Sequence, residues 1–134
     1  MIGLDANVLV RYFAQDDAAQ SPLATQLIEG LTTEAPGFIS TVTLVETVWV
    51  LSKAYRTPRA RIGATIEGLL RAREMVVENA EAAYLALNLY QTTTIDFADG
   101  LIAQTARLAG CHETVTFDIA AADGAGMRLL HPTS

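Results

Sequence analysis

The sequence predicts an α/β fold built on a mainly parallel central sheet with helices on both of its faces. Short apolar runs alternate along the chain with longer segments in which apolar residues recur at helical spacing, and this alternation is typical of parallel sheets. No internal repeat, low-complexity tract or linker interrupts the pattern. A chain of 134 residues is also of ordinary size for one domain. We therefore expect a single domain over residues 1–134.

Four strands are expected in the central sheet, with a fifth at its edge. The first strand, Ile2–Leu4, is apolar and has no polar flank, as strands buried on both faces of a parallel sheet are. It leads directly to Asp5. The other expected strands are short apolar runs bounded by polar or turn residues: 38–40, 75–77, 114–117 and the edge strand 128–130. The sequence thus predicts a sheet of four to five strands.

Six helices are expected between these strands. One should start at Ser21-Pro22, where serine caps the helix and proline occupies its first turn, with Leu23 and Leu27 on the apolar face. Gly110 should end another helix, because glycine readily adopts the left-handed conformation that follows a helix. The expected helices begin after Asn7 and cover 21–31, 43–51, 57–70, 80–89 and 97–108.

The composition limits the class of protein. With 51% hydrophobic residues and a mean hydropathy of +0.28, the chain is apolar for a soluble protein, so another chain should cover part of its surface. No apolar run approaches the ~20 residues that span a bilayer, and the first strand leaves no room for a cleavable signal segment. The single cysteine, Cys111, excludes an internal disulfide and suits a reducing compartment. We expect a cytoplasmic protein without a membrane segment.

Charge is unevenly distributed along the chain. The net charge of −6 argues against a protein that holds nucleic acid by bulk charge alone. However, six of the nine basic residues lie in segment 53–73, where Glu67 is the only acid. This basic segment is either a solvated helix face or a surface that follows a phosphate backbone, with Arg59 and Arg61 as the candidate contacts. A third use, binding a protein partner, also stays open.

Four carboxylates occupy equivalent places in the predicted topology. Asp5 and Asp118 end strands, whereas Glu46 and Asp99 lie in the first turns of helices. Right-handed crossovers bring such positions to one edge of a parallel sheet, which is where ligands bind in open α/β folds. Crowded carboxylates stay ionised at neutral pH only with a cation among them, and oxygen ligands without His or Cys select hard ions. The four acids therefore predict a site for Mg²⁺ or Mn²⁺.

Each acid also has a purely structural interpretation. Asp5 would bond the backbone of its own turn, and Asp118 would begin a loop. Thr43 and Glu46 have the spacing of a helix capping box, while Asp99 would favour the positive end of its helix dipole. Each of these roles is common for a single acid. All four together at one edge of a sheet would be a much rarer coincidence, which favours the metal site.

The motifs around these acids resemble those of PIN-domain ribonucleases, and more narrowly of VapC-type toxins from bacterial toxin–antitoxin pairs. The resemblance covers nearly the whole chain in order and rests on Met1–Tyr12 (MIGLDANVLVRY), Glu46, Phe97–Ala103 (FADGLIA) and Thr116–Asp118 (TFD). It implies a three-layer α/β/α PIN-like fold. It also implies a metal-dependent endoribonuclease that uses Mg²⁺ or Mn²⁺ to hydrolyse RNA phosphodiester bonds.

The resemblance implies roles for individual residues and partners. The catalytic and metal-binding residues would be Asp5, Glu46, Asp99 and Asp118, with Asn7 and Thr116 supporting them. Asp96, three residues before Asp99, is either an auxiliary acid or a solvent-facing turn residue. The implied partners are an RNA substrate, a cognate antitoxin protein and a second copy of the chain.

Two alternatives to a ribonuclease are a phosphatase with an aspartyl nucleophile and a non-catalytic binding module. An aspartyl-nucleophile phosphatase needs an acid two residues after Asp5 to protonate its leaving group, but Asn7 stands there. A non-catalytic PIN-like module that binds RNA or protein stays an alternative, because a fold does not fix a function. Trp49, the only tryptophan, is expected in the core or at an interface.

Overall fold

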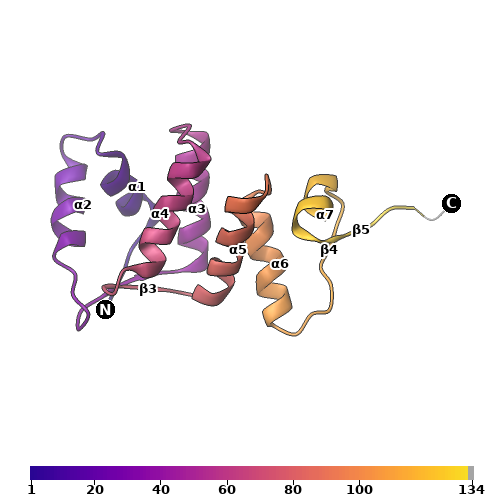
Figure 1. Ribbon diagram of the computed structural model, residues 1–134. Coiled ribbons are helices and arrows are strands. Elements are labelled where there is room, and N and C mark those ends of the chain that lie inside the picture. The colour runs from indigo at the N-terminus through magenta and orange to yellow at the C-terminus, as the bar shows by residue number, and fades with distance from the viewer. Residues whose placement is uncertain (133–134) are drawn as a thin grey trace. The chain divides into compact units, whose positions relative to one another are not determined.

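The structure is a computed structural model that describes residues 1–132, and it divides into two compact units (Figure 1). The first unit runs from Met1 to Glu78, and the second begins at Asn79. Residues 1–132 form seven helices and five short strands, the α/β composition that the sequence predicts. In this range no helix is both long enough and apolar enough to span a bilayer.

The first unit contains a parallel sheet of three strands. They are β1 (Ile2–Gly3), β2 (Gly37–Ile39) and β3 (Met75–Val77), in the order β1-β2-β3. In the central strand, Phe38 lies opposite both Gly3 and Val76. The Leu4 amide continues the pairing by donating to the Phe38 carbonyl at 2.9 Å. The end of β1 is thereby fixed, and the chain leaves the sheet at Asp5.

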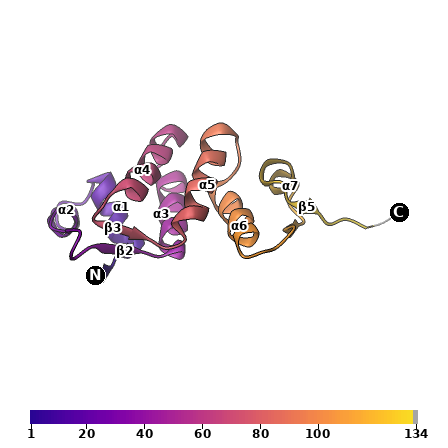
Figure 2. The same ribbon diagram turned by 60° about the horizontal axis from the view of Figure 1, so that its bottom comes forward.

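Four helices complete the first unit: α1 (Ala6–Ala14), α2 (Gln20–Glu29), α3 (Thr41–Lys53) and α4 (Arg59–Arg71). Helix α1 contacts both α2 and α3, while α4 contacts α3 and β3. Helices α3 and α4 run side by side in both ribbon views (Figures 1 and 2). The side chains with almost no exposure include Leu9, Ile39, Leu44, Ile62 and Ile66. Burying each such side chain contributes roughly 1.5–3 kcal/mol to stability.

The second unit is built around the helix pair α5 (Ala80–Thr92) and α6 (Phe97–Leu108). Small residues allow the two helices to approach closely, since a Cβ added at Gly100 would lie only 3.6 Å from the Ala86 Cβ. Tyr90 and Phe97 are both buried, and their rings pack edge to face with centroids 6.1 Å apart. This packing fixes the first turn of α6, which carries Asp99.

A second parallel sheet contains β4 (Val115–Thr116) and β5 (Arg128–Leu129), with α7 (Ile119–Ala125) between them in sequence. The prediction of one sheet with four to five strands is therefore wrong, because the described chain has a sheet of three strands and a sheet of two. Strand–helix alternation indicates where strands lie, but it carries no information on which edge a two-residue strand joins. An ion pair between Glu113 Oε2 and Arg128 Nε, at 2.9 Å, fastens β5 beside β4 and holds the pKa of Glu113 below its usual value.

The start of helix α2 and the presence of helix α7 differ from the sequence-based expectations. Helix α2 begins at Gln20, so Ser21 lies inside it and is not its cap; just before the helix, Asp17 Oδ1 accepts from the Ala19 and Gln20 amides at 3.0 and 2.7 Å. Ser21 is buried and donates to the Arg11 carbonyl at 2.9 Å. Helix α7 was not expected at all, because the alanine-rich sequence after Asp118 has no apolar stripe.

The apolar face of α2 also differs from the prediction. Ala24 and Ile28 are buried with Ser21, whereas Leu23 and Leu27 are 67% and 41% exposed. Which stripe of α2 faces the core is set by the packing of this helix against α1. By contrast, the prediction for Gly110 is confirmed, since it follows the last turn of α6 with a φ of +102°.

Candidate active site

Asp5 stands at the junction of β1 and α1, as the sequence predicts. It is the N-cap of α1, and its Oδ1 accepts a hydrogen bond from the Ala6 amide at 2.7 Å. The structural interpretation of Asp5 is thus confirmed, yet the residue remains exposed to solvent. Asn7 lies in the first turn of α1 and is also exposed. Neither role as a cap nor exposure prevents Asp5 from offering its second oxygen to a ligand.

Glu46 has no capping role, so the capping-box interpretation is wrong. Helix α3 begins at Thr41, and its cap is Ser40, whose Oγ accepts from the Thr43 amide at 3.1 Å. Glu46 therefore lies in the second turn of α3, where its side chain is exposed. The sequence-based error came from placing the helix start two residues too late. Without a local structural role, Glu46 is available for chemistry.

Asp5 and Glu46 line the same open hollow, although they lie far apart in the sequence. The hollow has a volume of about 490 Å³ and lies on the first unit. Its lining residues come from α1, α3 and the turn after α3: Asp5, Ala6, Asn7, Val10, Arg11, Glu46, Trp49, Val50, Ala54 and Tyr55. The structure thus brings together the first two predicted acids and the predicted supporting residue Asn7.

Three of the polar or aromatic residues of this hollow were not predicted as part of a site: Arg11, Trp49 and Tyr55. Arg11 Nη1 donates to the Tyr55 hydroxyl at 2.9 Å, and that hydroxyl donates to Asp16 Oδ2 at 2.8 Å. Arg11 Nε donates to Gln20 Oε1 at 2.8 Å. The hydrogen bond to Asp16 raises the pKa of Tyr55. The aromatic character of two of these residues was the available signal, but sequence alone does not say which aromatics are exposed.

The second unit carries the other two acids, with Asp96 close by. Asp96 is the N-cap of α6, and its Oδ1 accepts from the Ala98 amide at 3.2 Å. Asp99 follows in the first turn and is half-buried. Burial raises the pKa of Asp99, and the negative charges of Asp96 and then Asp118 raise it further. Asp99 is therefore a carboxylate whose ionised form is disfavoured by its surroundings.

Asp118 ends β4 and begins α7, rather than starting a loop. Its Oδ1 accepts from the Ala120 and Ala121 amides at 2.8 and 3.2 Å. Its own amide donates to Thr116 Oγ1 at 3.0 Å. Thr116 thus holds the turn in which Asp118 lies. The Asp118 side chain is exposed and close enough to Asp99 to influence its pKa.

The donor set of these residues fits a hard divalent cation. All the candidate ligands are carboxylate oxygens, which Mg²⁺ and Mn²⁺ prefer. A cation beside Asp99 would also offset the repulsion from Asp96 and Asp118 that raises its pKa. Within residues 1–132, no three side chains of His, Cys, Asp or Glu lie close enough together to share a metal ion. The predicted quartet is present as two pairs, one in each unit.

Comparison with known protein families identifies the family to which the chain that carries these acids belongs. The model of the PIN domain family matches residues 2–126. The chain belongs to the PIN domain family. A PIN domain is generally a metal-dependent nuclease module that uses divalent ions. The match spans both units, and so includes both pairs of acids.

A comparison with curated proteins finds no match to the chain. The PIN domain match therefore supplies the family and its general chemistry. The substrate of this PIN domain and the residues that act on it have to be inferred from its own side chains.

Proposed function

We propose that this PIN domain is a metal-dependent endoribonuclease that hydrolyses RNA phosphodiester bonds with Mg²⁺ or Mn²⁺. The observation that carries the proposal is the hollow that Asp5 and Glu46 both line, although they are far apart in the sequence. The chain that carries them belongs to a family of generally metal-dependent nucleases. The family resemblance of the acidic motifs supports RNA as the substrate. The open hollow suits a polymer better than an enclosed cavity would.

The four acids have related tasks in this proposal. Asp5 and Glu46 of the first unit and Asp99 and Asp118 of the second would supply the oxygen ligands for metal, and Asp96 would add negative charge beside Asp99. When bound, the ion would polarise a phosphate oxygen, make a water more acidic and offset charge on the leaving oxygen. Asn7 would position the chain after Asp5. Thr116 would do the same for Asp118, whose amide donates to its hydroxyl.

The test is RNA cleavage by the purified protein with Mg²⁺ or Mn²⁺ and with excess EDTA. We expect cleavage only with the ion, because the ion supplies several kcal/mol of charge stabilisation in the transition state. We also expect products that carry a 5′-phosphate. Sequencing of 5′ ends would then give the cut sites. RNA incubated with the ion alone is the control. Cleavage that proceeds equally well in EDTA would contradict the metal mechanism.

The alternative is a non-catalytic PIN-like module that binds RNA or protein. Such a module would bind its partner equally well with and without the ion and would leave RNA intact. Calorimetric titration with Mn²⁺ distinguishes the two, since a binding module has no need for the ion. The acids around Asp99 favour the nuclease, because binding alone does not require a carboxylate whose ionised form is disfavoured by burial and by the negative charges of Asp96 and Asp118.

We further propose that the protein acts in the cytoplasm as the toxin of a type II toxin–antitoxin system. This proposal rests on the resemblance to VapC-type toxins and on the exposed leucines of α2, Leu23 and Leu27. Both line an apolar groove of about 540 Å³ with Met1 and Ile2. A segment of a cognate antitoxin would cover this groove, and a homodimer would cover further apolar surface. Growth arrest on expression, relieved by an antitoxin and absent in a cleavage-deficient variant, would be the supporting result.

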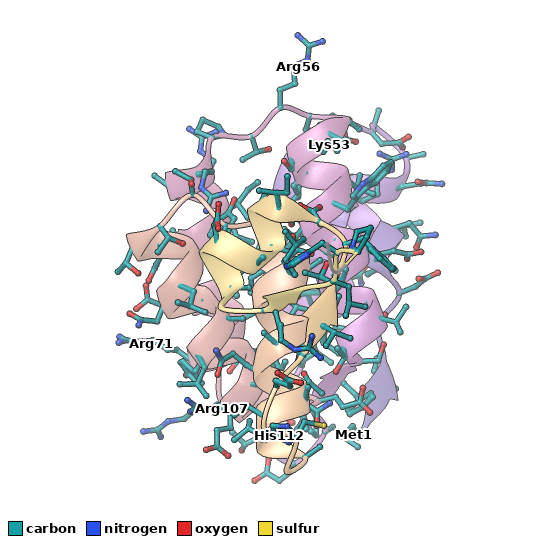
Figure 3. All side chains as sticks on the ribbon, turned by 90° about the vertical axis from the view of Figure 1, so that its right-hand side faces the viewer. Met1, Lys53, Arg56, Arg71, Arg107 and His112 are labelled. Carbon is teal, nitrogen blue, oxygen red and sulfur yellow. The ribbon has the colours of Figure 1, made fainter. Side chains whose placement is uncertain are left out.

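The basic segment is the candidate surface for the RNA backbone. Lys53 and Arg56 lie at and just after the end of α3, and Arg56 extends outward from that turn (Figure 3). Arg59 and Arg61 lie exposed in the first turn of α4. At the other end of α4, Arg71 pairs with Glu67 at 3.3 Å.

Changing Arg59 and Arg61 together to Gln should weaken RNA binding and flatten its dependence on salt. Each lost phosphate contact lowers the salt slope by about one unit, because fewer counterions are released. The measurement is RNA affinity across a series of salt concentrations in EDTA, with Arg71→Gln as the matched control. An unchanged slope would return the segment to the solvated-face interpretation. Loss of antitoxin binding in the same variant would assign it to that partner.

A further inference from the structure

The geometry points to Trp49 as a stacking platform for an unpaired RNA base, placed beside the acids of the first unit. This inference deepens the ribonuclease function proposed above and rests on it. Trp49 was expected in the core or at an interface, but its side chain is 61% exposed. Tryptophan is usually well buried because of its large apolar surface. An exposed tryptophan inside a hollow that also contains two candidate catalytic acids calls for a ligand.

Trp49 and Glu46 are placed together by the helix that carries them both. They are three residues apart on α3, and residues at this spacing are neighbours on one helix face. Both line the hollow of about 490 Å³ that also contains Asp5. This volume falls in the range of ~300–1,000 Å³ that is typical of sites for small ligands. One nucleotide of a longer strand is a ligand of this size class.

The same hollow contains a fixed positive charge. Arg11 lines it, and its guanidinium is held in place by hydrogen bonds from Nε to Gln20 and from Nη1 to Tyr55, together with an ion pair between Nη1 and Asp16 at 3.4 Å. Its Nη2 donates no hydrogen bond to any residue in the range 1–132, so donors remain for a phosphate. An arginine with a fixed orientation suits phosphate recognition. An aromatic platform with a nearby cation is the usual combination in sites for single-stranded nucleic acid.

The polarity of the hollow favours a nucleotide over a protein partner. Asp5, Asn7, Arg11 and Glu46 line the same hollow as Trp49, and charged residues are depleted at the centres of protein–protein interfaces. A nucleotide offers an apolar base face to Trp49 together with polar and charged atoms for these neighbours. By contrast, Val42 is 72% exposed on the same helix and does not line this hollow. Val42 therefore serves as a matched control on α3.

Two measurements in EDTA, where no cleavage occurs under the proposed function, test the platform. Trp49 is the only tryptophan, so its fluorescence reports directly on stacking. We expect a short single-stranded RNA to quench it, and an oligomer of equal charge with abasic sugars to leave it unquenched. We also expect Trp49→Leu to weaken RNA affinity, measured by anisotropy of labelled RNA, by about tenfold to a hundredfold. Trp49→Phe should recover part of the affinity, and Val42→Ser should bind as the wild type does.

Several results would overturn the platform. Equal RNA affinity of the wild type and Trp49→Leu would do so, as would equal quenching by the abasic oligomer. A Trp49→Leu variant that loses self-association in light scattering while keeping its RNA affinity would assign the ring to a contact between copies. The ribonuclease function fails separately. RNA binding that depends on Trp49 without any cleavage in Mn²⁺ would support the platform and refute the nuclease, whereas cleavage with an unchanged KM in Trp49→Leu would refute only the platform.

Discussion

Replacing Asp99 with asparagine should abolish RNA cleavage while leaving the protein folded. Asp99 is the half-buried acid of the candidate site, and both Asp96 and Asp118 raise its pKa. A bound cation would relieve this repulsion, so the ionised carboxylate of Asp99 would be favourable only when the ion is present. Losing a ligand that contributes several kcal/mol corresponds to a rate loss of about a hundredfold to ten thousandfold. The measurement is single-turnover cleavage in Mn²⁺, and Asp123→Asn, an exposed acid of α7, is the control.

Although Asp99→Asn should lose activity, it should not lose stability at neutral pH. Because the pKa of Asp99 is raised above 3.8, the folded protein binds this proton more tightly than the unfolded chain does. The free energy of unfolding therefore falls as the pH rises from the ordinary pKa through the raised one. Asparagine removes this loss, so Asp99→Asn should be no less stable than the wild type at about pH 7 in EDTA.

Urea unfolding at about pH 4 and about pH 7 measures this difference. The wild type should lose more stability between the two pH values than Asp99→Asn does, with Asp123→Asn following the wild type. If Asp99→Asn were less stable than the wild type at neutral pH and still cleaved RNA normally, Asp99 would be a structural residue of α6 instead.

Replacing Glu46 with glutamine should also cause a large loss of cleavage, but with no change in stability. Glu46 is exposed in the second turn of α3 and has no capping role. Glutamine keeps its size and removes the charge that would face the ion, so we expect a loss of about a hundredfold or more. The matched control is Glu29→Gln, an exposed acid at the end of α2. Cleavage and thermal unfolding of both variants decide the outcome, and normal cleavage by Glu46→Gln would remove it from the site.

A double variant tests whether the acid pairs of the two units serve one ion. If Glu46 and Asp99 hold the same ion, Glu46→Gln and Asp99→Asn together should weaken Mn²⁺ binding by less than the sum of the single effects, because either change already breaks the site. Residues that share a partner are non-additive in this way, whereas independent sites add. Additive losses in a calorimetric titration would show that each pair binds its own ion.

Much of the candidate site could be predicted from the sequence because its residues occupy strand ends and first turns of helices. Asp5, Asp99 and Asp118 lie where the alternation of strands and helices places them. Glu46 lies on the expected helix, although that helix begins earlier than predicted. These positions depend on local sequence, which carries the information that defines short elements and their boundaries.

The remaining features depend on tertiary packing, and the sequence does not reveal that. The pairing of β4 with β5 instead of with a larger sheet involves two residues of each strand. Which leucines of α2 face outward depends on how this helix packs against α1. The exposure of Trp49 and the network that holds Arg11 likewise follow from how α1 and α3 pack together.

Three of the acids at the candidate site also fasten the helices that follow them. Asp5, Asp96 and Asp118 each accept backbone hydrogen bonds at the start of a helix. Asparagine is as good a cap as aspartate, whereas alanine costs about 1 kcal/mol at such a position. A single base change converts an aspartate codon into one for asparagine. Natural loss-of-function alleles at these positions should therefore yield intact but inert proteins, which persist in the cell and compete with active copies for the same partners.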